Sequence, residues 1–213
     1  MKEKDKKKEF IYFIKIILLG ESGVGKTSLI NVYFDNNFNN NEISTGSVKE
    51  SFNTEKINNK IYKINIWDTM GQEKYRSLVK TFINESNIVI FVYDITRKKT
   101  FTELKYWVDK TKEELTNEKA IFGVAGNKID LIENLEIDKN EGEKFAKSIG
   151  ALFCETSAKE NPKTFKSFIQ ELLKKMDISD NSMQNEENFI QNDIVSFKLN
   201  KNKKKNNKKK CCL

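Results

Sequence analysis

The sequence contains no histidine, only three cysteines, and no apolar run near the roughly 20 residues that a membrane-spanning helix needs. The absence of histidine excludes histidine-based metal sites, nucleophile relays and acid–base catalysis. Two of the cysteines are adjacent near the end of the chain, so a disulfide framework is excluded. Residues 1–9 are rich in Lys and Glu and lack the apolar stretch of a secretory signal. We therefore expect neither a secreted protein nor a membrane-spanning one.

Positive charge is in excess, but it is concentrated in one short segment. The 213 residues carry 38 basic and 31 acidic side chains, which gives a formal net charge of +7. Seven of the lysines lie within residues 201–210, which contain no acidic residue, and the rest of the chain balances 31 basic against 31 acidic residues. A neutral body argues against a nucleic-acid-binding face on the folded part, so we expect no nucleic-acid partner.

Apolar segments and helical patterns alternate along the first 176 residues. Residues 10–19 are almost wholly apolar, which predicts a strand buried on both faces, as in a parallel sheet. The same reasoning predicts further strands and helices. The strands lie at 61–67, 88–93, 121–125 and 151–154, and the helices at 26–34, 100–115 and 138–148. This alternation predicts an α/β layered fold with a largely parallel sheet.

A final helix is indicated by its start and by its apolar periodicity. Asn161 can cap this helix, and Pro162 occupies the first turn, where a missing N–H has no cost. The chain becomes polar from residue 177 onward, so we interpret 177–213 as a disordered tail. The predicted organisation is a charged extension at 1–9, one domain at 10–176 and the tail. Apolar residues recur at three- and four-residue spacing along the helix, at Phe165, Phe168, Ile169, Leu172, Leu173 and Met176.

A glycine-rich segment directly follows the first predicted strand. Residues 20–27 read Gly-Glu-Ser-Gly-Val-Gly-Lys-Thr, the strand–GxxxxGK[ST]–helix pattern. Its glycines allow backbone N–H groups to converge on one concavity, which together with a helix N-terminus binds phosphate. Lys26 would reach the terminal phosphates, and the Thr27 hydroxyl would ligate Mg²⁺. A glycine-rich turn without a ligand is the alternative, but the flanking strand and helix favour nucleotide binding.

Two polar segments at later strand ends predict which base is bound. Residues 127–130, Asn-Lys-Ile-Asp, follow a predicted strand, and the Asp130 carboxylate can accept hydrogen bonds from both the N1–H and the amine of guanine. Residues 155–159, Glu-Thr-Ser-Ala-Lys, follow the next strand. There the Ala158 N–H would meet the guanine oxygen, and Lys159 would lie against the ring. Two ordinary strand-end loops are the alternative interpretation.

A further segment carries groups suited to phosphoryl transfer. Residues 67–73 read Trp-Asp-Thr-Met-Gly-Gln-Glu. Asp68 can hold Mg²⁺ through water, the Gly71 N–H can contact the γ-phosphate, and Gln72 can orient the attacking water. Upstream, the Thr45 hydroxyl can add a second hydroxyl ligand to Mg²⁺, although a surface turn is the alternative at Thr45.

Together these segments resemble the Ras-like small GTPases and, within them, the Rab branch. GESGVGKT, WDTMGQEKYRSL, FVYDIT, GNKID and ETSAK occur in the Rab order, at close to Rab spacing, over residues 10–176. The resemblance implies a P-loop NTPase fold of three layers, with a six-stranded, mostly parallel sheet and about five helices. It implies catalytic roles for Lys26 and Gln72, and metal binding by Thr27, Thr45 and Asp68. The nucleotide-binding residues that it implies are Ser22, Gly23, Val24, Gly25, Lys26, Thr27, Ser28, Phe38, Thr45, Gly71, Asn127, Lys128, Asp130, Ser157, Ala158 and Lys159.

The chain departs from the Rab pattern at two places near the nucleotide. After Thr45 it reads Gly-Ser-Val-Lys-Glu where Rabs have Ile-Gly-Val, so charges enter the effector strand. Met70 replaces the alanine of the DTAGQ box, and its bulky side chain predicts slow hydrolysis. No arginine occupies the nucleotide-facing loops up to Thr69, so the expected unaided turnover is on the order of 10⁻⁴ to 10⁻³ per second. A GTP-loaded effector-binding scaffold with little hydrolysis is the alternative to a cycling switch.

The last six residues combine lysines with paired cysteines. Residues 208–213 read Lys-Lys-Lys-Cys-Cys-Leu, so the cysteine that a C-a-a-X box needs at position 210 is missing. Rabs are instead geranylgeranylated on paired terminal cysteines, which implies lipidation of Cys211 and Cys212. Two prenyl chains beside a lysine run would anchor stably to an anionic membrane surface. A solvated tail or a nuclear signal is the alternative for the lysines.

The predicted function is that of a Rab-like GTP-binding switch for membrane traffic, which uses GTP, GDP and Mg²⁺ and acts as a monomer on the cytoplasmic face of endomembranes. The segments YRSL and FVYD resemble the Golgi-associated Rabs, which implies a place on the Golgi. The family implies an exchange factor, a GTPase-activating protein, a dissociation inhibitor with a cytosolic pool, an escort protein and effectors as partners. A P-loop kinase or ATPase is an alternative function, but the segments 127–130 and 157–159 argue against it because they predict guanine recognition. Nucleic-acid binding through the lysine tail is another alternative.

Overall fold

The computed structural model describes residues 10–35, 49–58, 60–69 and 82–177, and the structural statements below concern these ranges. The chain divides into two compact units, Met1–Leu173 and Lys174–Leu213. The sheet and the site residues described below lie in the first unit. Of the second unit only residues 174–177 are described, and they are helical. No helix in the described ranges is long and apolar enough to span a membrane.

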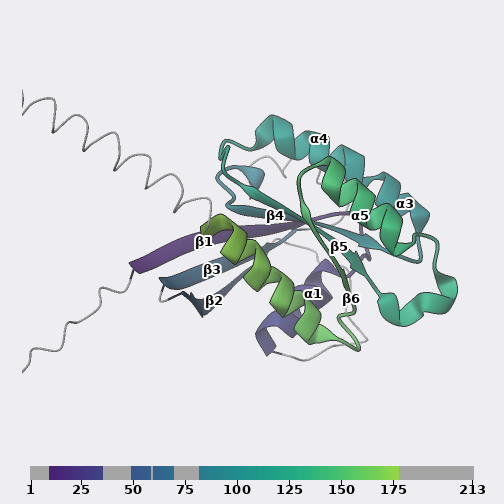
Figure 1. Cartoon of the computed structure of the whole chain (residues 1–213), viewed down its shortest axis with the longest axis horizontal. Helices are drawn as coiled ribbons and strands as arrows, with labels where there is room; N and C mark the ends of the chain where they lie inside the picture. The colour runs from purple at the N-terminus through teal and green to yellow at the C-terminus, as the bar shows by residue number, and fades with distance from the viewer. Residues whose placement is uncertain (1–9, 36–48, 59, 70–81, 178–213) are drawn as a thin grey trace, which may run out of the picture. The chain divides into compact units, whose positions relative to one another are not determined.

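Six strands form one sheet in the order β2-β3-β1-β4-β5-β6 (Figure 1). All neighbouring strands are parallel except β2, which runs antiparallel to β3 at the edge of the sheet. The central strand β4 is buried at every position, as expected for a strand with parallel neighbours and helices on both faces. The prediction of a six-stranded, mostly parallel sheet is confirmed. The strands are β1 (Phe10–Leu19), β2 (Lys49–Ile57), β3 (Lys60–Asp68), β4 (Ile88–Asp94), β5 (Ile121–Asn127) and β6 (Leu152–Thr156).

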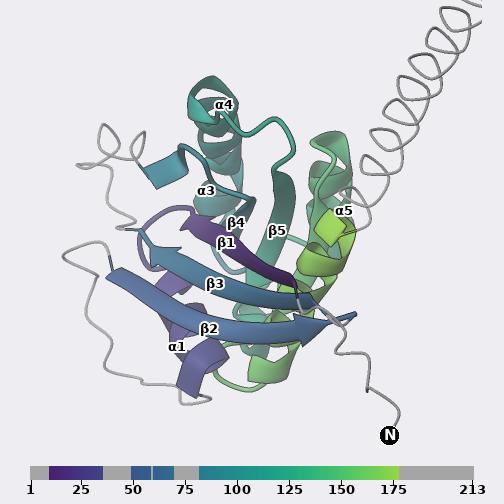
Figure 2. The ribbon, with the colours of Figure 1, turned by 90° about the vertical axis from the view of Figure 1, so that its left-hand side faces the viewer.

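Helices cover both faces of this sheet (Figure 2). Val124 of β5 belongs to the cluster packed under α4 and α5, whereas a Cβ at the adjacent Gly123 would meet Phe168 and Leu172 of the helical segment 162–177. Because side chains alternate along a strand, these helices lie on opposite faces. The result is the predicted three-layer α/β architecture. The helices are α1 (Lys26–Asp35), α3 (Lys98–Thr102), α4 (Leu104–Glu114), α5 (Lys139–Ser148), the 3₁₀ helix η2 (Ile129–Asn134) and the segment 162–177.

The helix starts follow from local chemistry. At α5, the Asp138 carboxylate accepts from the Glu141 N–H while the Glu141 side chain accepts from the Asp138 N–H, which is a complete capping box. The predicted start of the last helix at Pro162 is confirmed. The predicted apolar positions of that helix in the first unit are all buried, namely Phe165, Phe168, Ile169, Leu172 and Leu173.

One helix prediction was wrong, and one strand was not identified from its own residues. The expected helix 100–115 is two helices, α3 and α4, separated at Glu103, whose N–H bonds to the carbonyls of both Lys99 and Phe101. Strand β2 was implied only by the resemblance to Rabs and not by its own residues, because its sequence, KESFNTEKI, is mostly polar. The partner strand β3 explains why this segment is extended, since β2 pairs with it along its whole length. A strand at a sheet edge tolerates such polar composition because one face and one edge can meet water.

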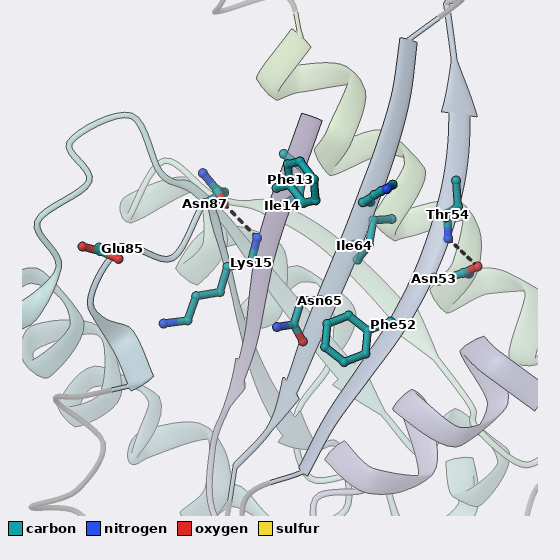
Figure 3. A pocket seen from close by; sticks show the side chains of 11 residues that line it. Phe13, Ile14, Lys15, Phe52, Asn53, Thr54, Ile64, Asn65, Glu85 and Asn87 are labelled. Carbon is teal, nitrogen blue, oxygen red and sulfur yellow. Dashed lines mark hydrogen bonds between the residues drawn. The ribbon is translucent and has the colours of Figure 1, made fainter. Parts of the chain in front are cut away.

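The outer face of β1 is only half covered, which corrects the prediction of a strand buried on both faces. Ile11 and Phe13 are 51% and 74% exposed, whereas the residues from Ile16 to Leu19 are fully buried. The strand pairing gives the reason, because β1 pairs with β3 along almost its whole length but with β4 only from Ile16 onward. Phe13 and Phe52 border an open groove of about 450 Å³ that is lined by β1, β2 and β3 (Figure 3).

Candidate nucleotide-binding site

The predicted site residues gather at the carboxyl ends of the parallel strands. Strand register places Asp68 beside Leu18, at the ends of β3 and β1. It also places Asp94, Asn127 and Thr156 side by side at the ends of β4, β5 and β6. Ligands of open α/β sheets bind outside the carboxyl ends of the strands, so this edge is the expected place for a ligand site.

The glycine-rich segment forms a tight turn between β1 and α1, and two of its glycines are required there. Gly20 and Gly25 have φ values of +148° and +96°, which L side chains rarely adopt. A Cβ at Gly20 would collide with the carbonyl oxygen of Val92, and a Cβ at Gly25 would collide with the amide nitrogen of Asn127. A glycine-rich turn of this kind, directly before a helix N-terminus, suits the phosphates of a nucleotide. Ser28 lies in the first turn of α1.

Lys26 lies folded over this loop. Its Nζ donates hydrogen bonds of 2.9 Å to the carbonyl oxygens of Gly20 and Glu21, and the residue is only 5% exposed. Burial lowers the pKa of Lys26 to about 8, although the nearby carboxylates of Asp68 and Glu21 act in the opposite direction. A polyanion beside this ammonium would stabilise its charged form.

Thr27 and Asp68 bring two oxygen atoms together at the start of α1. The Thr27 hydroxyl donates a hydrogen bond of 2.7 Å to Oδ2 of Asp68, and Asp68 is buried. The next residue fixes the end of β3, because the Thr69 hydroxyl donates to the Leu18 carbonyl oxygen at 2.6 Å. A hydroxyl and a carboxylate are ligand types that Mg²⁺ prefers in proteins, so these two predicted residues fit a magnesium ion.

Asn127 joins the base-reading segment to the phosphate loop. Its Nδ2 donates a 2.8 Å hydrogen bond to the carbonyl oxygen of Val24, across 103 residues of sequence. Its Oδ1 is buried and has no hydrogen-bond partner within the described ranges. A buried acceptor without a donor is costly unless a ligand or water supplies one, so Oδ1 fits a site that a nucleotide completes.

The two predicted base-reading segments meet at Asp130. The Ser157 hydroxyl donates to Oδ1 of Asp130 at 2.6 Å and accepts from the Glu160 N–H at 2.9 Å, so both segments are held in one arrangement. Ala158 is buried beside this contact, and Lys159 is exposed. The structure thus brings together the carboxylate and the loop that were predicted to read guanine.

Several predicted residues lie outside the described ranges and stay predictions. They include the aromatic base contact, the second metal ligand, the residues at the γ-phosphate and the lipidation sites, namely Phe38, Thr45, Gly71, Gln72, Cys211 and Cys212. Met70 and the lysine run 201–210 also lie outside these ranges.

Sequence reasoning missed Trp107, Asp94 and Arg97 at this edge, whereas Lys128, which contacts Asp94, was predicted. Trp107 of α4 donates from Nε1 to the Glu21 carboxylate at 3.1 Å, and so holds the phosphate loop from the helix side. Lys128 adopts a left-handed conformation, with φ of +72°, and its Nζ lies 2.7 Å from Oδ2 of Asp94. Arg97 contacts the same carboxylate and also the loop at Ser22. The position of Asp94 at the end of a fully apolar strand was the one available signal.

The fold and this edge define a P-loop nucleotide-binding protein. The profile described as "Ras family" matches residues 15–178, which is more than half of the chain. The chain is 41% identical to the human Ras-related protein Rab-21 over 167 residues, which cover 78% of this chain and 72% of that protein. It is 37% identical to zebrafish (Danio rerio) Rab-18-B over 175 residues, covering 81% and 85% of the two chains. It is 38% identical to human Rab-12 over 178 residues, covering 81% and 72%.

The chain belongs to the Ras family and is a small GTPase of the Rab branch. As a member it binds guanine nucleotides and hydrolyses GTP, and it regulates membrane traffic on endomembranes. The predicted family and enzyme class are therefore confirmed.

Proposed function

We propose that this chain cycles between a GTP-bound and a GDP-bound form, with slow unaided hydrolysis that an activating protein accelerates. The hydrogen bond from Asn127 to the Val24 carbonyl carries the proposal. Because this bond fixes the base-reading segment against the phosphate loop, one nucleotide can engage both at once. A guanine nucleotide held at both ends can report the presence of its terminal phosphate to the rest of the protein.

The base is recognised by Asp130, Ser157, Ala158 and Lys159. The Asp130 carboxylate accepts hydrogen bonds from the N1–H and the amine of guanine. The Ser157 hydroxyl, which donates to the same carboxylate, holds it in place. Adenine offers no such pair of donors in that geometry, so a buried acceptor would be left unpaired with an adenine nucleotide. Phe38 packs on the guanine ring in this proposal.

The phosphates are held by the amides of residues 22–28 and by Lys26. Mg²⁺, when bound, would offset charge on the β- and γ-phosphate oxygens. Thr27 and Thr45 would supply its hydroxyl ligands, and Asp68 would hold it through water. The contact between the Thr27 hydroxyl and Asp68 supports this assignment because it places a ligand and an anionic partner together.

Hydrolysis depends on residues around the γ-phosphate. Lys26 offsets the negative charge that develops between the β- and γ-phosphates, and Gln72 orients the attacking water. The Gly71 N–H and the Thr45 hydroxyl sense the γ-phosphate, so loss of this group releases both segments and ends effector binding.

In this proposal the last residues of the chain attach the switch to a membrane. We propose that Cys211 and Cys212 carry prenyl groups beside the lysine run, with an escort protein for their modification and a dissociation inhibitor that maintains a cytosolic pool. An exchange factor, an activating protein and effectors complete the cycle of a monomeric switch. The resemblance of YRSL and FVYD to Golgi-associated Rabs supports the cytoplasmic face of the Golgi as its place.

A GTP-loaded scaffold with little hydrolysis is the second candidate, favoured by Met70 and by the charged residues after Thr45. Two measurements test the proposals. Calorimetry with protein stripped of nucleotide should give tight binding of GTP and GDP and at least about 10³-fold weaker binding of ATP. Single-turnover hydrolysis, with and without the catalytic domain of an activating protein, should then show strong acceleration for a cycling switch and none for a scaffold.

Membrane attachment has its own test. A tagged full-length chain should localise to endomembranes, and a version lacking Cys211 and Cys212 should be dispersed. Equal localisation of the two versions would contradict attachment through the cysteines.

A further inference from the structure

Arg97 bridges two segments that are far apart in the sequence. Its Nε donates to Oδ2 of Asp94 at 2.9 Å, and its Nη2 donates to the carbonyl oxygen of Ser22 in the phosphate loop at 3.1 Å. Ser22 and Arg97 are 75 residues apart. One guanidinium therefore joins the phosphate loop to the end of β4.

The carboxylate of Asp94 is shared with the base-reading segment. The Lys128 ammonium lies 2.7 Å from the same Oδ2, while Oδ1 accepts from the Thr96 N–H at 3.0 Å and from the Thr96 hydroxyl at 2.7 Å. The Asp94 side chain is only 1% exposed. Burial by itself raises the pKa of Asp94, but the hydrogen bonds from Lys128 and Thr96 outweigh it and hold the pKa below its ordinary value. Asp94 is therefore an ionised carboxylate that contacts two cations, Arg97 and Lys128.

Arg97 lies against the backbone of the phosphate loop, where its guanidinium donates to the Ser22 carbonyl oxygen. Gly23 agrees with this placement, because the atom nearest to a Cβ built at Gly23 is Nη2 of Arg97, at 3.5 Å. Arg97 thus contacts the phosphate loop at Ser22 and lies beside Gly23.

We propose that Arg97 is a positioning residue that holds the phosphate loop to the base-reading segment through Ser22, Asp94 and Lys128, and so slows the release of bound guanine nucleotide. The inference rests on the proposed nucleotide site and names a determinant of its release rate. A loop already held in its binding arrangement loses less entropy when the phosphates bind. The guanidinium suits this role because its fork presents two donors in fixed directions, which the single ammonium of lysine cannot do.

The test measures nucleotide release from the full-length chain. Protein loaded with fluorescently labelled GDP is mixed with excess GDP at fixed Mg²⁺, and the release rate is followed. The loss of the Arg97 contacts should speed the release of GDP. Because Arg97 is partly exposed, water weakens these contacts, and we expect release from the Arg97→Ala variant to be only about three- to tenfold faster than from the parent chain. The matched control is Lys99→Ala, which removes one exposed positive charge two residues away and should stay within about twofold of the parent.

Two further readouts separate positioning from a general loosening of the protein. In the Arg97→Lys variant, the logarithm of the GDP release rate should lie closer to that of Arg97→Ala than to that of the parent chain. If Arg97→Ala does not fold, faster release from Arg97→Lys than from the parent chain tests the inference instead. The preference for GDP over IDP, which lacks the guanine amine, should be unchanged in both variants because the contact of Asp130 with Ser157 does not involve Arg97.

Three results would overturn the inference while leaving the proposed function intact. They are release from Arg97→Ala within twofold of the parent, full recovery in Arg97→Lys, or a loss of GDP-over-IDP preference that parallels a lower unfolding temperature. Failure of the parent chain to bind GDP would instead overturn the proposed function, and the inference with it.

Discussion

The hydroxyl of Thr27, in the first turn of α1, donates a 2.7 Å hydrogen bond to the carboxylate of Asp68, at the end of β3. The two residues are 41 positions apart, yet the parallel pairing of β1 with β3 places Asp68 beside Leu18, two residues before the phosphate loop. The magnesium-binding function proposed for this pair therefore depends on strand register as much as on the residues themselves.

Removal of the Thr27 hydroxyl should raise the Mg²⁺ concentration that nucleotide retention requires. In Thr27→Val the side chain keeps its branched shape but loses a ligand, so the free Mg²⁺ needed for half-maximal retention of GDP should rise about 10- to 100-fold. Release of labelled GDP across a series of buffered Mg²⁺ concentrations measures this. Thr102→Val, which removes an exposed hydroxyl on α3, is the control, and equal Mg²⁺ midpoints in the two variants would refute the assignment.

Nucleotide binding should take up protons near pH 8. The protein groups around Lys26 hold its pKa at about 8, chiefly through burial, and the negative charge of a bound polyphosphate raises it. Half of the Lys26 ammonium groups are deprotonated at pH 8 before binding, so Lys26 should take up about half a proton on GDP binding there and almost none at pH 6.5. Affinity should accordingly fall as pH rises above 8.

Calorimetry of GDP binding in two buffers with different protonation enthalpies gives the number of protons taken up. Lys99→Ala should behave as the parent chain does, because Lys99 is exposed. Equal binding enthalpies in both buffers at pH 8 would show that Lys26 does not titrate there.

A change of Asp130 to asparagine should change the base that is bound. The amide presents an N–H donor where the carboxylate accepted, which suits the 2-oxygen of xanthine and opposes the 2-amine of guanine. GDP affinity should fall at least about 100-fold in Asp130→Asn, and xanthosine diphosphate should become the better ligand. Competition binding of the two nucleotides measures the switch, with the exposed Asp109→Asn as control. An unchanged preference for GDP over xanthosine diphosphate would show that Asp130 does not contact the base.

Glycine is required at position 20 by space as well as by conformation. In Gly20→Ala the new Cβ would collide with the backbone carbonyl of Val92 in the buried strand β4, so we expect the free energy of unfolding to fall by about 3 kcal/mol or more. Gly150→Ala is the matched control, since Gly150 also has positive φ but has open space around its Cβ position. Its cost should be only about 1 to 2 kcal/mol. Urea denaturation measures both, and equal losses would show that the backbone contact does not matter.

Replacement of Met70 by alanine should speed hydrolysis. Met70 adjoins Gly71, whose N–H is proposed to contact the γ-phosphate, and a smaller side chain removes a steric obstacle to that approach. Single-turnover GTP cleavage in Met70→Ala should be several-fold faster than in the parent chain, while Met183→Ala in the tail should leave it unchanged. An unaltered rate in Met70→Ala would remove the proposed effect of this substitution.

The reach of sequence reasoning differs between elements for physical reasons. Buried strands such as β4 are long apolar runs, so their places were predicted to within one or two residues. Strand β2 carries a polar sequence and is held by its pairing with β3, which no local pattern reveals. The separation of α3 from α4 at Glu103 was likewise missed, because helical periodicity continues across that residue.

The candidate site divides in the same way. The phosphate loop and the base-reading segments are contiguous and follow strands, so local pattern predicted Lys26, Thr27 and Asp130, and the resemblance to Rabs added Asn127. Arg97, Asp94 and Trp107 come from elements without such a pattern. Arg97 and Trp107 contact the loop directly, and Asp94 is joined to it through Arg97. A side chain that contacts a distant segment of the chain produces no recognisable pattern in the sequence around it.

The sequence by itself determined the glycine-rich loop, the segments predicted to read guanine and the layered fold, because each depends on local backbone geometry or on short-range apolar periodicity. The tertiary structure alone decided how these parts are held together. The bonds from Asn127 to Val24, from Thr27 to Asp68 and from Arg97 to Ser22 join residues 41 to 103 positions apart. Such contacts exist only after the strands have paired in register, since pairing is what brings their carboxyl ends to one edge.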